Sequence, residues 1–155
     1  MKAGYLAIES PPIGTDDPGL IKILSWDELP HEATQNQDEA NHANYPKNVH
    51  YVAQFNDILA AGMHFHNGLR RQLVDINEKT YRAELTHAIA VIEAESDLRH
   101  ERIWMDPAID QNDLEAINQD ADKIRSKKEK INLLIKILGI FAVALLIFNA
   151  VTSVI

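Results

Sequence analysis

The C-terminal stretch from Ile131 to Ile155 constrains the fold most, because it is almost wholly apolar and residues 137–155 carry no charge. As an α-helix, the uncharged part alone spans roughly 30 Å, the thickness of the hydrocarbon core of a bilayer. The sequence therefore predicts a transmembrane segment over residues 131–155. A long apolar helix can also lie at the centre of a soluble bundle or in the wall of an oligomeric tube, and these alternatives stay open.

Basic residues gather just before this stretch and one turn inside it, and such residues favour the cytoplasmic side of a membrane. We therefore expect a single-pass membrane protein with its N-terminus on the cytoplasmic or internal side, or alternatively a virion component. The expected membrane-flanking basic residues are Arg125, Lys127, Lys128, Lys130 and Lys136.

The net charge of −8 and the lack of cysteine exclude several classes of function. An acidic chain repels nucleic acid, so we expect no nucleic-acid partner by direct readout. Without cysteine the chain forms no disulfide, no iron–sulfur cluster and no thiol nucleophile. We find no phosphate-binding glycine-rich loop and no serine-hydrolase or zinc-protease motif, and expect no catalysis and no cofactor.

Residues 1–48 have the composition of an irregular docking arm followed by a polar linker, because proline, glycine and aspartate signal turns and residues 31–48 are rich in polar residues. One dense apolar patch interrupts the arm, and we expect it to dock on another protein subunit or a neighbouring copy. The patch consists of Leu20, Ile21, Ile23, Leu24 and Trp26.

The rest of the chain shows helical patterns. Apolar residues recur every three or four positions from Val49 to Met63, which predicts the first helix of a hairpin over residues 49–105. We expect the second helix of the hairpin to run from Leu69 to Trp104, with an apolar stripe that changes phase near Asn77. Asp106 and Pro107 suit the start of a long helix over residues 106–155. The predicted fold class is all-α: an irregular N-terminal arm, a helical hairpin, and a long C-terminal helix that continues into the transmembrane span.

The first part of the long helix, residues 106–130, carries apolar residues at alternating steps of three and four, which is typical of a coiled-coil stem. The alternative is an amphipathic helix that packs on its own upstream helices. The expected oligomer seam is Leu114, Ile117, Ala121, Ile124, Ile131 and Ile135.

Two short patterns invite a metal hypothesis, although neither predicts a site. His64 and His66 are two positions apart near a helix end and point away from each other. Glu84 and His87 have the Glu-x-x-His spacing of di-iron bundles, but the matching carboxylate-bearing helices are not evident and surface ion pairing explains them as well.

These features predict a membrane-anchored, homo-oligomeric assembly protein that captures partners at a lipid bilayer. The first alternative is a phage virion protein that is ejected with the genome and forms a channel in the host envelope. The second is a metal-binding helical bundle.

Overall fold

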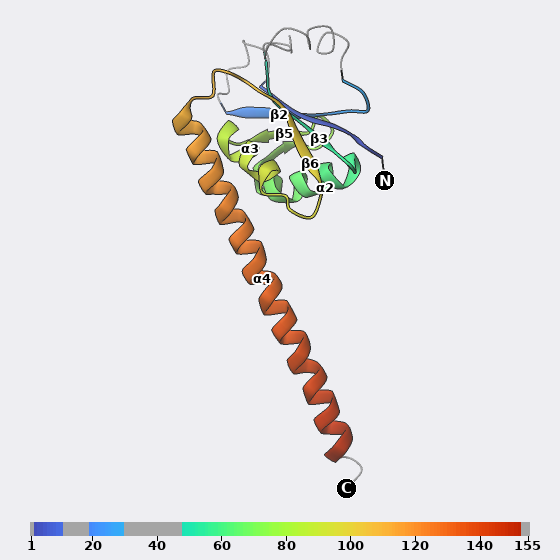
Figure 1. Cartoon of the computed structure of the whole chain (residues 1–155). Coiled ribbons are helices and arrows are strands. Elements are labelled where there is room, and N and C mark those ends of the chain that lie inside the picture. Colours follow the sequence, from blue (N-terminus) through green and yellow to red (C-terminus); the bar gives the residue numbers. More distant parts are fainter. Residues whose placement is uncertain (1, 11–18, 30–47, 153–155) are drawn as a thin grey trace.

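An antiparallel β-sheet forms the centre of the computed structural model, which describes residues 2–10, 19–29 and 48–152 (Figure 1). Within these residues the sheet has six strands in the order β4-β5-β2-β1-β3-β6, and all neighbouring strands are antiparallel. The strands are β1 (Gly4–Glu9), β2 (Leu20–Trp26), β3 (Val49–Phe55), β4 (Leu73–Asp75), β5 (Thr80–Arg82) and β6 (His100–Met105).

The helices lie mainly on one side of this sheet. They are α2 (Ile58–Leu69), the short 3-10 helix η1 (Arg70–Gln72), α3 (Leu85–Glu93) and the long α4 (Gln111–Thr152). Asp57 caps α2 by accepting a hydrogen bond from the backbone N–H of Ala60. Asp110 plays the same part for α4, since its side chain accepts from the N–H of Asp113 at 2.8 Å.

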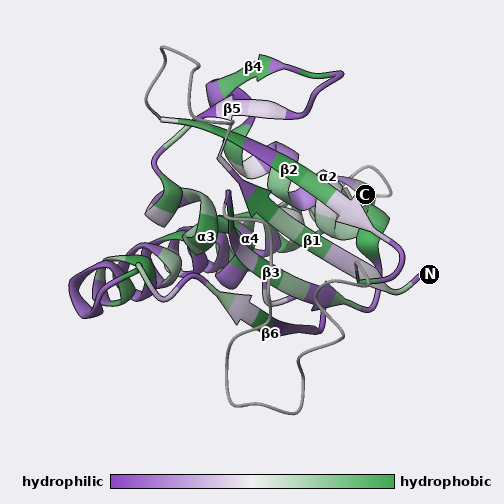
Figure 2. Ribbon diagram, turned by 90° about the horizontal axis from the view of Figure 1, so that it is seen from above, coloured by the Kyte–Doolittle hydropathy of each residue, from purple (hydrophilic) through white to green (hydrophobic). Residues whose placement is uncertain are grey.

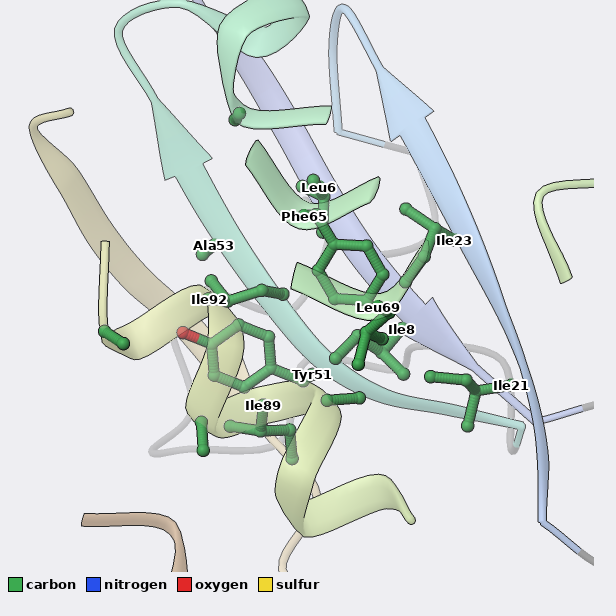
Figure 3. Close-up of a cluster of buried hydrophobic side chains, with 14 of the residues drawn as sticks. Leu6, Ile8, Ile21, Ile23, Tyr51, Ala53, Phe65, Leu69, Ile89 and Ile92 are labelled. Atoms are coloured by element: carbon green, nitrogen blue, oxygen red, sulfur yellow. The ribbon is translucent and has the colours of Figure 1, made fainter. Parts of the chain in front are cut away.

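The main core lies between the sheet and the helices α2 and α3 (Figure 3). The helix α4 packs against α3. Tyr51 and Ile8 from the central strands are fully buried there, as are Leu69 of α2 and Ile89 of α3. A smaller cluster around Val52 lies on the opposite face, so β3 is apolar on both sides; Figure 2 shows the strands from that face. We call the sheet with α2 and α3 the head.

The predicted all-α fold is therefore wrong. The expected irregular arm contains β1 and β2, and the expected first helix of the hairpin begins as β3 and is helical only from Ile58. The apolar steps of β3 resembled a helix because a strand buried on both faces loses its alternating pattern. In β2, by contrast, Ile21 and Ile23 alternate with more exposed neighbours, as expected for a strand that turns one face towards the main core.

The expected second helix, from Leu69 to Trp104, is also wrong. After Leu69, which ends α2, this stretch forms η1, β4, β5, α3 and β6, and only the nine residues of α3 are α-helical. The change of apolar phase near Asn77 reflects the turn between β4 and β5, where the Asp75 side chain accepts hydrogen bonds from the N–H groups of Asn77 and Glu78.

The expected long C-terminal helix is present as α4, although it begins at Gln111 rather than at Pro107. Among the described residues, however, the structure contains no helix with a stretch apolar and long enough to cross a bilayer, which overturns the predicted single-pass membrane localisation. The predicted span relied on counting residues to Ile155. It includes Asn132, Lys136 and Asn149, and its last three residues lie outside the described part of the chain.

Candidate functional site

The second half of α4 extends away from the head (Figure 1). It exposes a dense set of apolar side chains. Their exposed fractions range from 47% at Ile131 to 74% at Leu138. They point in every direction around the helix, which is a pattern found where a helix is enclosed by other apolar surfaces. We call residues 131–146 the exposed half of α4; its large apolar side chains are Ile131, Leu133, Leu134, Ile135, Ile137, Leu138, Ile140, Phe141, Val143, Leu145 and Leu146.

The first half of α4, residues 111–128, is docked on the head. Ile117 and Ala121 are almost completely buried in the main core, and Ile124 packs against it. The predicted seam therefore divides into two parts. Its upstream residues pack within the chain, against α3 and the main core, and Leu114 lies half-buried at the start of the same helix. Ile131 and Ile135 are exposed.

Lys128 fixes the helix where the docked half ends. Its Nζ lies 3.1 Å from Oε1 of Glu95 and 2.6 Å from Oδ2 of Asp97. The other oxygen of Glu95 lies 2.6 Å from Nδ1 of His64 on α2. Burial alone would raise the pKa of Glu95, but the N–H of Asp97 and the ammonium of Lys128 outweigh it and hold that pKa below its usual value. One carboxylate thus joins α2, the end of α3 and α4.

Arg125 makes a second connection, because its guanidinium donates to the backbone carbonyl of Glu93 at the end of α3 and to the side chain of Asp122. Two of the five basic residues expected beside a membrane, Arg125 and Lys128, therefore bind the head. Lys127, Lys130 and Lys136 are exposed on α4.

The side chain of Glu93 is the centre of a polar network beneath the sheet. The Tyr51 hydroxyl and the Arg102 Nε each donate to its Oε1 at 2.8 Å, and His100 Nε2 lies 3.6 Å from Oε2. Burial would raise the pKa of Glu93, but hydrogen bonds from His100, Arg102 and Tyr51 overcome this effect and lower the pKa to about 2. The hydrogen bond between His100 and Glu93 also raises the pKa of His100. The network links β3, α3 and β6.

The residues of the expected docking arm form β2 in the sheet. Ile21 and Ile23 are buried in the main core, so both already pack within the chain. Leu24 and Trp26 pack against the small cluster on the opposite face, and Leu20 is half-buried.

The three histidines among the weak metal candidates each make a separate contact. His64 binds Glu95, and His66 Nδ1 lies 3.1 Å from the Tyr81 hydroxyl. His87 Nδ1 lies 2.5 Å from Oδ2 of Asp120 on α4, while Glu84 precedes α3. Over residues 2–10, 19–29 and 48–152, no group of three or more potential ligands is arranged to hold a metal ion.

Sequence reasoning missed the residues that seat α4 on the head, above all Glu93 and Glu95. Glu93 is 42 positions from Tyr51, and Glu95 is 33 positions from Lys128, so no local spacing rule connects them. The one available signal was Lys128 itself, a charged residue in an otherwise apolar seam, which indicates a carboxylate partner as well as a membrane surface. In comparisons of the chain with protein-family models, curated proteins and solved structures, nothing matches.

Proposed function

We propose that this protein is a homo-oligomeric assembly module, in which the exposed half of α4 packs against the same segment of other copies. The heads then lie outside the helical bundle, attached through the docked half of α4. The observation that supports this most is the run of large apolar side chains with exposed fractions near or above one half, from Ile131 to Leu146.

The size of this surface argues for a macromolecular partner. Burying one large apolar side chain gains about 1.5–3 kcal/mol, and contiguous apolar patches of more than a few hundred Å² are rare on monomers. The exposed half is about 24 Å long as a helix. We propose that a second copy of this chain covers the exposed half of α4, because it supplies a segment of the same length and the same uncharged character after Lys136.

The apolar stripe of the docked half also has a continuation. Steps of four and three lead from Ile131 through Ile135 to Leu138, in phase with Ile117 and Ala121. We therefore place these three residues at the contact between copies. Leu133 and Ile140 lie on the opposite side of the helix and, in a symmetric bundle, face outward. Because apolar residues surround the helix, a contact on one face leaves much of it exposed, which favours three or more chains over two.

Sedimentation velocity of the full chain over a range of concentrations tests this proposal. The seam variant carries Ile135→Asp and Leu138→Asp, and the matched control carries Leu133→Asp and Ile140→Asp. Both variants add the same charge to the same stretch. We expect the wild-type chain and the control to sediment as oligomers, and the seam variant as a monomer, because each carboxylate enters a buried contact.

Four results contradict the proposal. A wild-type chain that sediments as a monomer at all concentrations excludes self-assembly. A seam variant that retains the wild-type mass excludes this contact. Equal dissociation of both variants means that the exposed half of α4 is enclosed evenly on all sides. If the chain floats with lipid vesicles as a monomer, lipid and not a second copy covers this segment.

A further inference from the structure

Three polar side chains that are far apart in the sequence meet at one edge of the sheet. Ser10 follows β1, His50 is the second residue of β3, and Asp106 follows β6. The strands β1, β3 and β6 are neighbours in the sheet, and each is antiparallel to the next. The end of β1, the start of β3 and the end of β6 therefore coincide.

These side chains form a continuous hydrogen-bonded chain. Ser10 Oγ lies 2.7 Å from Nε2 of His50, and Nδ1 of His50 lies 2.7 Å from Oδ2 of Asp106. With Asp106 ionised, the Nδ1–H of the imidazole donates to the carboxylate, so that Nε2 is left to accept the hydrogen of the Ser10 hydroxyl. This is the atom-by-atom arrangement of a serine nucleophile, its general base and the carboxylate that orients the base.

The backbone holds the three residues in place. The N–H of Ser10 donates to the carbonyl of Asn48 at 2.8 Å, and the N–H of Asp106 donates to the carbonyl of His50 at 2.9 Å. The second oxygen of Asp106 accepts from the N–H of Ala108. The side chains of His50 and Asp106 are 20% and 19% exposed, so they are shielded but still reach solvent.

A β-bulge supplies an independent observation. Ile8 pairs with Tyr51 and Glu9 with Val49, so the register between β1 and β3 skips His50. A bulge re-aims the side chain of the extra residue, and bulges occur often beside active sites. Here the irregularity falls on the residue that would act as the base.

We propose that Ser10, His50 and Asp106 form a nucleophilic site for acyl transfer from activated esters. The Ser10 oxygen attacks the ester carbonyl carbon while its proton passes to His50 Nε2. The bond to the leaving oxygen then breaks, and that oxygen takes the proton from His50. Water hydrolyses the acyl-serine in the second half: it gives a proton to Nε2, its oxygen bonds to the carbonyl carbon, and Ser10 leaves and recovers the proton.

The geometry also narrows the substrate class. The backbone N–H of Ser10 is engaged by Asn48, so it does not stabilise an oxyanion at the attacked carbonyl. Esters with a good leaving group, such as aryl esters, depend least on that stabilisation. We therefore assign the site to activated esters rather than to amides.

An alkyl fluorophosphonate tests the nucleophile directly on the full chain, because the Ser10 oxygen forms a bond to phosphorus, fluoride leaves, and the hydroxyl proton passes to His50. We expect one adduct per chain, mapped by mass spectrometry to the peptide that contains Ser10. Ser10→Ala removes the adduct, and His50→Ala slows labelling at least 100-fold. Ser25→Ala changes an exposed serine elsewhere, and His87→Ala breaks the separate imidazole–carboxylate pair with Asp120; both keep labelling within twofold.

Asp106 is a positioning residue, so it needs a readout beyond loss of labelling. We expect Asp106→Asn to slow labelling at least tenfold, with Asp106→Glu restoring part of the rate because it keeps the carboxylate, while circular dichroism shows all variants folded. No adduct on Ser10 in the folded wild-type chain overturns the proposal. So does labelling that survives His50→Ala unchanged, or that persists in urea-unfolded protein at the same rate.

Discussion

Lys128 of α4 and Glu95, two residues beyond the end of α3, are joined by an ion pair of 3.1 Å three residues before the exposed half of the helix begins. The position of this pair matters because it divides one apolar stripe into two parts. Upstream, Ile117 and Ala121 bury the stripe against the head. Downstream, Ile131 and Ile135 leave it open to another chain.

Replacing Lys128 with Met tests how strongly this pair holds the helix. Glu95 is only 11% exposed and loses the ammonium group of Lys128, so we expect the free energy of unfolding to fall by about 1–3 kcal/mol. Lys127→Met is the matched control on the neighbouring exposed residue and should stay within about 0.5 kcal/mol of wild type. Urea unfolding followed by circular dichroism measures both; equal effects would show that the ion pair contributes nothing specific.

Ile117→Ala tests whether the upstream stripe belongs to the core of the head. Its side chain is 1% exposed, so truncation leaves a cavity and should cost about 2–5 kcal/mol. Ile76→Ala removes the same atoms from a side chain that is 64% exposed and should change stability by less than about 0.5 kcal/mol. A small effect of Ile117→Ala in the same unfolding assay would mean that α4 is not packed against α3 as described.

Two glycines of α2 should respond to the same substitution in opposite directions. A Cβ at Gly62 meets no atom within 4 Å, so Gly62→Ala should stabilise the helix by about 0.5–1 kcal/mol. A Cβ at Gly68 lies 2.5 Å from Cγ1 of Val91 on α3, a side chain with little rotamer freedom, so Gly68→Ala should destabilise the head by about 1–3 kcal/mol. Adding Val91→Ala should cost less in the Gly68→Ala background than in wild type, as a double-mutant cycle of thermal melts can measure.

Glu93 should make stability depend on acid. Its pKa in the folded chain is about 2, below the ordinary value of 4.5, so its contribution is present above about pH 4.5 and is lost as the pH falls towards 2. The shift corresponds to at most about 3 kcal/mol, reduced by solvent screening at a partly exposed carboxylate. The difference in unfolding free energy between wild type and Glu93→Gln should therefore shrink from pH 6 to pH 3. A difference that does not change with pH would contradict the charged network.

The sequence predicted the long helix but not what its first half packs on. Steps of three and four from Leu114 onward predict one apolar stripe, and α4 carries that stripe. Apolar periodicity shows which face of a helix is buried but not which surface covers that face. Ile117 packs on the head itself, against α3 and the core beneath the sheet. The sequence predicts α3 only as part of a longer helix.

The sheet was missed for two physical reasons. β3 is buried on both faces, so its apolar residues are not separated by polar ones, and β4 and β5 are three residues each, too short to show any period. The candidate triad was missed for a third reason. His50 is 40 positions from Ser10 and 56 from Asp106, and only the order of the strands brings them together.

Because α4 is one continuous helix, it would fix how each head is rotated about the axis of the proposed oligomer. Ile117 and Ala121 lock one side of the helix to the head, and the same helix presents Ile135 about five turns after Ile117. One residue inserted between the two halves would rotate every head by about 100°, whereas seven would return it to within about 20° of its first orientation. In the proposed oligomer, the length of this helix would therefore decide which surfaces of neighbouring heads, including the edge that carries Ser10, face one another.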